Sequence, residues 1–406
     1  MDPNFKFLDT CDLDTQRLIA ALGAADDSRE TEMGCSDGDK QQGKRVIETA
    51  GCGGPTRKEP PKRETAAGRA TAGRVVPIAI PNHQQTIQTM ETREPEVIRD
   101  KEAMRRWSRS MRSQGKTIGL VPTMGFLHDG HLSLVRQSLT LSDVTVVSIY
   151  VNPGQFSPTE DLSTYPSDFS GDLAKLTAVS SSGSVIVVFN PKNLYDYDGV
   201  RNEKTNSGGG GGGGKVVSCV EEGGLGHETW VRVERLEKGL CGKSRPVFFR
   251  GVATIVTKLF NIVEPDVAMF GKKDYQQWRL IKRMVRDLDF GIEIVGSDIA
   301  REKDGLAMSS RNVHLSAEDR QRALSISRSL AMAKAYAEQG KIGCKELKDM
   351  IISEIVGAAG RIDYVEIVDQ ETLEGVEEIK SGVVICVAAW FGTVRLIDNI
   401  EINVTV

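Results

Sequence analysis

Residues 117–131 read TIGLVPTMGFLHDGH and join an expected strand to the start of an expected helix. The run Thr117–Val121 is apolar and is followed by a proline, as is typical of a strand buried on both faces of a sheet. Leu132–Leu141 then have apolar residues at helical spacing. A buried strand that leads directly into a helix is the repeating unit of a parallel α/β sheet, so this segment predicts that fold class.

Three further apolar runs rich in valine and isoleucine repeat the strand pattern: Val144–Val151, Val185–Phe189 and Val267–Phe270. Segments with helical spacing lie at Thr254–Ile262 and Tyr275–Leu288. Strands that alternate with helices predict a doubly wound parallel sheet over residues 93–299. Because ligands of such sheets bind at the carboxyl ends of the strands, we expect a site at that edge.

The last part of the chain, residues 300–406, has a different order of elements. Helical spacing at Ala317–Gln339 and Cys344–Ala358 precedes the strand-like runs. These runs are Tyr364–Val368, Val383–Ala388 and Val394–Ile397. Helices followed by strands that are joined through short turns predict a smaller α+β domain.

Two segments lack the apolar side chains that a core needs. Residues 1–92 contain two aromatic residues, Phe5 and Phe7, and this composition predicts a disordered N-terminal extension. A partner-binding or regulatory arm is the alternative. Residues 198–226 include seven consecutive glycines, Gly208–Gly214, and predict a flexible insert. The glycines lack the Lys-Ser/Thr pair of a phosphate loop, so we interpret them as a linker.

Composition excludes several classes of protein. The 406-residue chain has a net charge of −4, which disfavours nucleic acid and anionic membranes as partners. The longest apolar run, Val383–Phe391, is much shorter than the about 20 residues of a membrane helix. Seven cysteines without a CxxC pair argue against zinc motifs and a disulfide framework. The acidic start resembles neither a secretory nor a transit signal, so we expect a cytoplasmic protein.

Two of the five histidines, His128 and His131, lie where the first expected helix begins. They share one helix face, and the free N–H groups and positive dipole end of a helix N-terminus favour phosphate. Gly125 and Gly130 allow the backbone to approach a ligand closely. Histidines there can stabilise charge on a leaving pyrophosphate. The alternative is a loop whose histidines only cap the helix.

The decapeptide PTMGFLHDGH, residues 122–131, resembles the HxGH signature of the nucleotidyltransferase superfamily. More closely, it resembles the ATP-binding segment of the pantothenate synthetase (pantoate–β-alanine ligase) family, in a plant-like version. Further matches follow in order: VNPGQF at 151–156, FGKKDYQQ at 270–277, DGLAMSSRN at 304–312 and RLIDN at 395–399. The resemblance covers about residues 93–406 apart from the glycine insert. It implies a Rossmann-like nucleotide-binding domain of the HxGH type.

The resemblance also implies roles for single residues. His128, His131 and Lys273 would be catalytic, with His131 as a proton donor. Gln155 and Gln277 would contact pantoate, with Gln155 also near β-alanine, since an amide offers both a donor and an acceptor. The implied ATP contacts are Met124, Gly125, His128, Gly130, His131, Gly271, Lys273, Asp274, Ala300, Met308, Ser309, Ser310 and Arg311.

The match also has departures from the family pattern. Where family members often carry adjacent acidic residues that help to bind magnesium, this chain has Asp172 beside Gly171. We therefore expect Mg²⁺ to arrive with ATP, with Asp172 as the one protein ligand to consider. Lys272 stands where the family commonly has a glutamate, a reversal of local charge. The family also implies a homodimer.

The activity that the resemblance implies is ATP-dependent condensation of (R)-pantoate with β-alanine. A pantoyl adenylate would form first with release of pyrophosphate, and β-alanine would then displace AMP, a good leaving group. One alternative is another nucleotidyltransferase on the same fold, which would not need the Gln155–Gln277 pair. A second is a non-catalytic interaction protein, against which the intact histidines and Lys273 argue.

Overall fold

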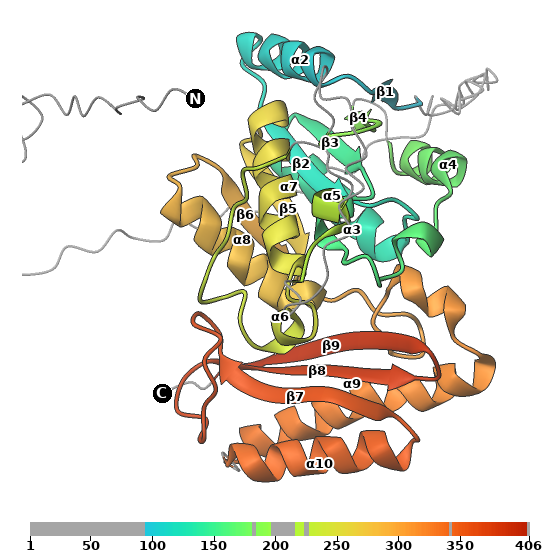
Figure 1. The fold of residues 1–406 in the computed structure, drawn as a ribbon, viewed down its shortest axis with the longest axis vertical. Helices are drawn as coiled ribbons and strands as arrows, with labels where there is room; N and C mark the ends of the chain where they lie inside the picture. The colour runs from blue at the N-terminus through green and yellow to red at the C-terminus, as the bar shows by residue number, and fades with distance from the viewer. Residues whose placement is uncertain (1–93, 181–183, 196–215, 223–226, 341–342, 404–406) are drawn as a thin grey trace, which may run out of the picture. The chain divides into compact units, whose positions relative to one another are not determined.

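The computed structural model describes residues 94–180, 184–195, 216–222, 227–340 and 343–403. All of them belong to one compact unit of the chain, Gln84–Val406. Their strands form a six-stranded and a three-stranded sheet (Figure 1). The predicted extension 1–92 and the glycine tract of the insert lie outside the described residues.

The larger sheet is parallel throughout, in the order β1-β4-β3-β2-β5-β6. Its strands are β1 (Glu96–Ile98), β2 (Ile118–Thr123), β3 (Val144–Ile149), β4 (Val185–Phe189), β5 (Val267–Gly271) and β6 (Glu293–Ser297). The apolar runs of the sequence are the four central strands, because these are buried on both faces. The edge strands β1 and β6 were not predicted, since they are short and only partly apolar.

Helices cover both faces of this sheet. The bounds are α2 (Lys101–Ser113), α3 (Asp129–Leu141), α4 (Phe169–Val179), α7 (Phe248–Val263) and α8 (Tyr275–Asp287). Leu120 and Val146 pack in one core cluster with α7 and α8. Val121 and Val147, which point to the opposite face, pack in another with α3 and α4. The prediction of a doubly wound α/β sheet is therefore confirmed.

Short elements connect these layers. They are η1 (Pro153–Gln155), η2 (Leu162–Thr164), α5 (Cys219–Glu222), α6 (Leu240–Ser244), η3 (Lys272–Asp274) and η4 (Ser310–His314). Residues 216–222 differ from the expectation of a flexible coil over 198–226. There Val220 is buried and Glu221 pairs with Arg250 of α7. This anchored segment is only a few residues long. The glycine-rich composition around it therefore outweighed its apolar residue in the prediction of a flexible coil.

The smaller sheet is antiparallel, in the order β7-β8-β9. Its elements are α9 (Ala317–Glu338), α10 (Cys344–Gly357), β7 (Arg361–Asp369), β8 (Val383–Phe391) and β9 (Val394–Ile402). One face packs on α9 and α10 through residues such as Ile385 and Leu330. Val384 and Cys386, on the opposite face, join the core of the larger sheet. The smaller α+β part is confirmed, whereas the division at residues 299 and 300 stays a prediction.

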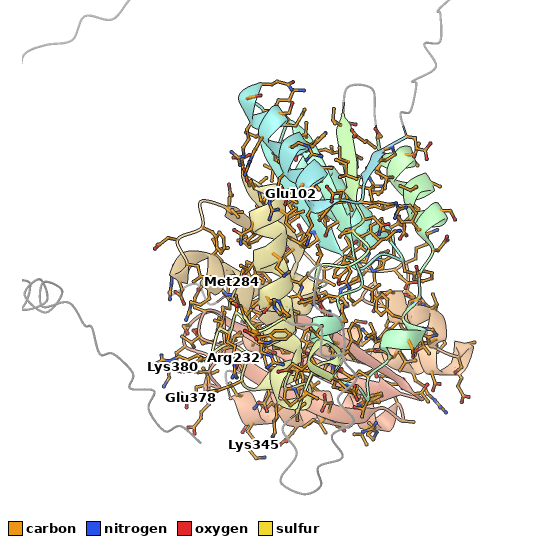
Figure 2. All side chains as sticks on the ribbon, turned by 45° about the horizontal axis from the view of Figure 1, so that its top comes forward. Glu102, Arg232, Met284, Lys345, Glu378 and Lys380 are labelled. Atoms are coloured by element: carbon orange, nitrogen blue, oxygen red, sulfur yellow. The ribbon has the colours of Figure 1, made fainter. Side chains whose placement is uncertain are left out.

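Several charged side chains lie on the outside of the described unit. Glu102, Lys345 and Lys380 project from its helices and loops, whereas Met284 is buried (Figure 2). Within the part of the chain that the structure describes, no helix is both long and apolar enough to cross a membrane.

Helix α7 packs closely against the η1 turn, at Gly251. A Cβ added there would overlap the carbonyl group of Gly154 and the backbone of Gln155. We expect Gly251→Ala to lower the free energy of unfolding by about 1–3 kcal/mol, because the backbone must move apart. Urea unfolding measures this change. Gly291→Ala is the matched control, since its Cβ meets nothing within 4 Å and its stability should stay within about 0.5 kcal/mol. Equal stability of the two variants would contradict the close approach.

Candidate active site

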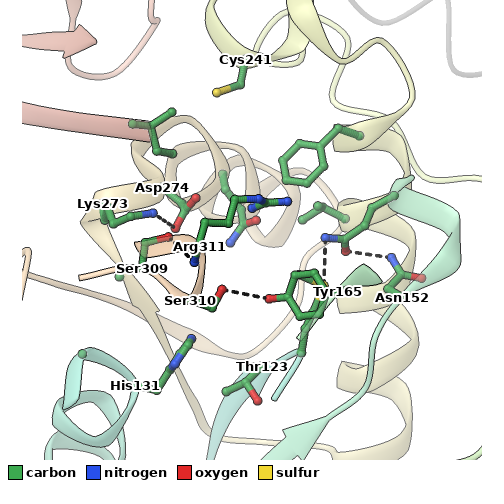
Figure 3. A pocket seen from close by; sticks show the side chains of 18 of the residues that line it. Thr123, His131, Asn152, Tyr165, Cys241, Lys273, Asp274, Ser309, Ser310 and Arg311 are labelled. Carbon is green, nitrogen blue, oxygen red and sulfur yellow. Dashed lines mark hydrogen bonds and ion pairs between the residues drawn. The ribbon is translucent and has the colours of Figure 1, made fainter. Parts of the chain in front are cut away.

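A cavity of about 910 Å³ lies at the carboxyl ends of β2, β3 and β5. Side chains from the larger sheet and from the chain after residue 300 line it together. In Figure 3, Lys273 and Asp274 lie beside Ser309 and Arg311. Of the site residues expected from the sequence, all except Gly125 and Asp172 line this cavity. The edge is the one expected for a doubly wound sheet.

The two histidines stand at the start of α3. Their ring centroids are 4.0 Å apart, and the backbone N–H of His128 donates to Nδ1 of His131 at 3.4 Å. Because Nδ1 accepts, the neutral His131 ring carries its proton on Nε2 and can donate it. Burial, followed by the charge of Lys273, lowers the pKa of His128 to about 4. Burial and the neighbouring His128 lower the pKa of His131 to about 3. Both rings are therefore neutral near pH 7.

The loop before α3 rests on Asp172. Its carboxylate accepts the N–H of Phe126 at 2.8 Å and that of Leu127 at 2.6 Å. Gly125 and Phe126 have φ values of 86° and 51°, and Lys175 donates to the carbonyl of Leu127. Burial raises the pKa of Asp172, although the two N–H groups oppose this rise. Asp172 thus supports the backbone of the histidine loop. It does not line the cavity, where a ligand of MgATP would be expected.

The described residues do not fit a resident metal ion. They contain no group of three or more His, Cys, Asp or Glu side chains that could hold one. Two carboxylates of the cavity are already paired, Asp161 with Arg311 and Asp274 with Lys273. The family pattern of adjacent acids has no counterpart around Asp172, whose two oxygens are used by backbone N–H groups.

Lys273 and Asp274 lie in η3, between β5 and α8. The neighbouring Lys272 pairs with Glu401 of β9 at 2.8 Å and with Asp298 at 3.3 Å. The charge reversal noted in the sequence is thus compensated by two carboxylates. Of the two adjacent lysines, only Lys273 lines the cavity.

Gln155 is buried and held in one orientation. Its Oε1 accepts from Nδ2 of Asn152 at 3.0 Å, and its Nε2 faces the sulfur of Met124 at 3.3 Å. Asn152 in turn accepts from the hydroxyl of Tyr195 at 2.8 Å. Sequence reasoning did not assign Asn152, although it lies in the same VNPGQF motif. Gln277 lines the cavity from α8.

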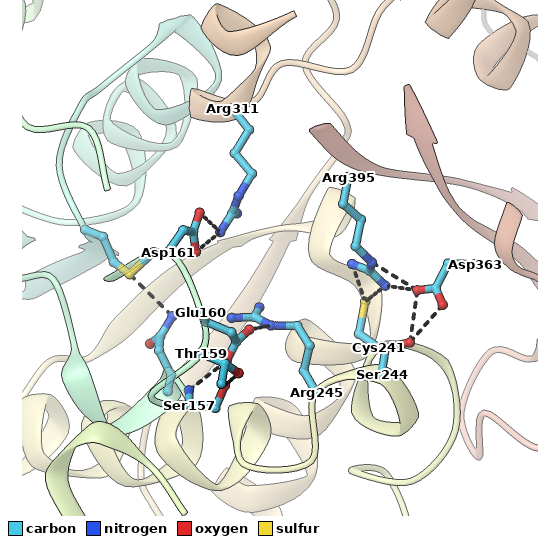
Figure 4. A network of polar contacts seen from close by, with 12 residues as sticks. Ser157, Thr159, Glu160, Asp161, Cys241, Ser244, Arg245, Arg311, Asp363 and Arg395 are labelled. Atoms are coloured by element: carbon cyan, nitrogen blue, oxygen red, sulfur yellow. Dashed lines mark hydrogen bonds and ion pairs between the residues drawn. The ribbon is translucent and has the colours of Figure 1, made fainter. Parts of the chain in front are cut away.

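The Met308–Arg311 loop reaches a loop that follows η1. Arg311 pairs with Asp161 at 3.2 Å, and the hydroxyls of Tyr165 and Ser310 are 3.4 Å apart (Figures 3 and 4). Asp161 and Tyr165 were missed as site residues. Tyr165 lies seven residues before Asp172, in the region that sequence analysis compared with the family. Asp161 carried no such signal, because its pairing joins positions 150 residues apart.

Two more arginines of the cavity were missed. Arg245 pairs with Glu160 and stacks on Phe248, 3.9 Å from the ring centroid. Arg395 pairs with Asp363 at 2.6 Å, and its guanidinium lies 3.6 Å from the sulfur of Cys241 (Figure 4). Arg395 lies in the RLIDN segment, which sequence analysis matched to the family without giving this residue a role.

A cavity at the carboxyl edge of a parallel sheet, with a helix N-terminus, a lysine and a Ser-Ser-Arg loop around it, defines a Rossmann-like enzyme with an anion-binding site. Residues 96–401 match the family described as Pantoate-beta-alanine ligase. The chain is 84% identical over 312 residues to a Pantoate--beta-alanine ligase of Arabidopsis thaliana, covering 77% of this chain and 99% of that protein.

Solved structures agree with this match. A pantothenate synthetase from Thermus thermophilus has a TM-score of 0.65 and 36% identity, covering 76% of this chain and 100% of that chain. A second structure is a pantoate-beta-alanine ligase from Francisella tularensis, complexed with beta-gamma ATP and beta-alanine. It has a TM-score of 0.56 and 29% identity, covering 75% of this chain and 97% of that chain. The chain belongs to the pantoate–β-alanine ligase family, and it is a ligase. The family prediction is confirmed.

The buried histidines make stability depend on pH. In the unfolded chain a histidine binds a proton below its ordinary pKa of 6.5, whereas folded His131 stays neutral down to about 3. Stability therefore falls as pH falls below 6.5, by up to about 1.4 kcal/mol per pH unit. We expect wild type to lose about 1–2 kcal/mol more than His131→Asn between pH 6.5 and 5. Urea unfolding at both pH values measures this, and equal losses would contradict a neutral His131.

Replacing Asp172 tests its place under the histidine loop. Asp172→Asn exchanges one acceptor oxygen for a donor that faces a backbone N–H. We expect a loss of about 1–3 kcal/mol in the free energy of unfolding. Asp129→Asn is the control, because Asp129 is exposed on the same segment. If both variants lost the same stability in urea unfolding, Asp172 would not be the support of this loop.

Proposed function

We propose that this chain condenses (R)-pantoate with β-alanine at the expense of ATP, and that it forms pantothenate through a pantoyl adenylate. In the first step a carboxylate oxygen of pantoate attacks the α-phosphorus of ATP and pyrophosphate leaves. In the second step the amine of β-alanine attacks the acyl carbon and AMP leaves. The observation that carries the proposal is the convergence of two neutral histidines, Lys273 and the Ser-Ser-Arg loop on one cavity.

The phosphate groups lie between α3 and the Met308–Arg311 loop in this proposal. The Nε2–H of His131 donates to an oxygen of the leaving pyrophosphate, which needs no prior protonation of the ring. Lys273 neutralises charge that develops at the α-phosphorus. Ser309, Ser310 and Arg311 grip the outer phosphates, with Arg311 exchanging Asp161 for a phosphate oxygen. Met124 and Gly130 line the cavity where the backbone approaches these phosphates, whereas Gly125, with its positive φ, shapes the turn before α3.

The nucleoside and the acid occupy opposite ends of the cavity in this proposal. Asp274 binds the ribose, and Gly271, which has no side chain, leaves room for the nucleoside beside it. Ala300 and Met308 contact the adenine end through their backbone. Gln155 and Gln277 bind pantoate. Since Oε1 of Gln155 already accepts from Asn152, its Nε2–H group is the part that is directed to a ligand oxygen. β-Alanine enters beside Gln155 after pyrophosphate has left.

Magnesium enters as part of the substrate MgATP in this proposal, because the described carboxylates do not fit a resident ion. We infer a cytoplasmic enzyme, since its described cysteines are all free and thiols stay reduced there. We also infer a homodimer, from family membership, and no nucleic-acid partner, from the net charge of −4.

The first experiment is an omission series with MgATP, pantoate and β-alanine. We expect AMP release only with all three components. Exchange of labelled pyrophosphate into ATP should need pantoate but not β-alanine, because the adenylate forms before the amine reacts. Pyrophosphate release with a different acceptor would favour another nucleotidyltransferase. A folded chain that binds ATP and stays silent in all mixtures would contradict the proposal.

Variants of His131 separate its two functions. His131→Asn keeps an acceptor near the position of Nδ1, and His131→Gln keeps a donor near the position of Nε2. We expect the asparagine variant to lose about 10²–10³-fold in the rate of pyrophosphate exchange, with its circular dichroism spectrum unchanged. The glutamine variant should retain more activity. Equal rates for wild type and His131→Asn would contradict the donor role.

A further inference from the structure

The RLIDN motif at 395–399 has no role in the chemistry described above, yet two of its polar side chains are buried. Asp398 and Asn399 in β9 are each 4% exposed. Neighbouring residues of a strand point to opposite faces, so the two side chains serve different neighbours. A buried carboxylate and a buried amide are costly unless they are hydrogen-bonded, and both form hydrogen bonds here.

Asn399 binds the backbone of η3. Its Nδ2 donates to the carbonyl of Lys272 at 2.9 Å and to that of Lys273 at 2.9 Å. On the same strand face, Glu401 pairs with Lys272 and accepts from the hydroxyl of Tyr275. The start of α8 and the turn before it are therefore tied to the smaller sheet. The backbone of Lys273 is thus hydrogen-bonded to a strand more than 120 residues away in the sequence.

Asp398 binds the segment that leads into the Met308–Arg311 loop. Its two carboxylate oxygens accept from the guanidinium of Arg301 at 2.7 and 2.9 Å. Arg301 also donates to the carbonyl of Gly305 and bridges to Ala307. The N–H of Met308 donates to the carbonyl of Ala300, which closes a small hairpin. The Met308–Arg311 loop continues directly from this hairpin.

We propose that Asp398 and Asn399 are the positioning residues of the ATP site, and that they hold its two separate halves in register from one strand. Asn399 fixes the turn of Lys273, and Asp398 fixes the hairpin that carries Ala300 and the Ser-Ser-Arg loop. Neither side chain touches ATP. The inference rests on the proposed function for the identity of the nucleotide.

Near-isosteric variants test the two contacts. Asn399→Asp turns the donor into an acceptor that faces two carbonyl oxygens, and Asp398→Asn breaks the paired hydrogen bonds to Arg301. We expect each variant to raise the Kd of MgATP about 10-fold, measured by titration calorimetry. We expect the rate of pyrophosphate exchange at saturating ATP to fall about 100-fold in Asn399→Asp, because a displacement of about 1 Å at a catalytic group has that effect. The KM for pantoate should change less than the Kd for MgATP.

The control is Ile402→Val, which removes a methyl group from a buried residue of the same strand. Its side chain packs in the core with α9 and α10. It should lower the melting temperature and leave the Kd of MgATP within twofold of wild type. A control that weakens ATP binding as much as Asn399→Asp would overturn the proposal, as would unchanged ATP binding in both variants of the motif.

The two proposals fail in different ways. Pyrophosphate exchange by the wild-type chain tests the reaction. The Kd of MgATP tests the positioning roles, because it can be compared between wild type and variants whether or not the chain turns over. Weaker ATP binding in both variants, with exchange absent in wild type, would overturn the reaction and support the positioning roles. Exchange in wild type, with ATP binding unaffected in the variants, would support the reaction and overturn the positioning roles.

Discussion

The carboxylate of Asp172 accepts the N–H groups of Phe126 and Leu127, and the rest of the site depends on this contact. It holds a turn in which Gly125 and Phe126 adopt positive φ values, a conformation that costs free energy for a phenylalanine. The turn presents His128 and His131 at the start of α3. Without it, the histidines would lack a fixed position relative to the sheet.

Around this turn, cations of the cavity are paired with carboxylates. Arg311 faces Asp161, Arg245 faces Glu160 and Arg395 faces Asp363. Pairing offsets part of the cost of keeping charge away from water, and it directs each guanidinium before a substrate arrives. A triphosphate can then replace a carboxylate without a large rearrangement. The neutral histidines complement this arrangement because they donate without adding charge.

The smaller sheet is part of the same site. Ile397 packs with the core of the larger sheet, while Leu396 and Ile402 pack with α9 and α10. Strand β9 therefore lies between two cores, which makes it a rigid support for the polar residues Asp398 and Asn399. Two segments that line the cavity, η3 and the loop at Met308–Arg311, are connected through it. A site built from segments far apart in sequence gains precision from such a shared support.

The sequence by itself determined the family, the parallel sheet and the segments that line the cavity. Strand burial and helical spacing are local patterns, so Ile118–Thr123, α3 and α9 were readable from neighbouring residues. The tertiary structure alone decided the place of Asp172 beneath the histidine loop, the pairing of Arg311 with Asp161 and the two contacts of Asn399. The edge strand β6 was also recognised only in the tertiary structure, because it is short and only partly apolar. These contacts join residues 45 to 150 positions apart, and no local pattern carries the information about which side chains meet across that separation.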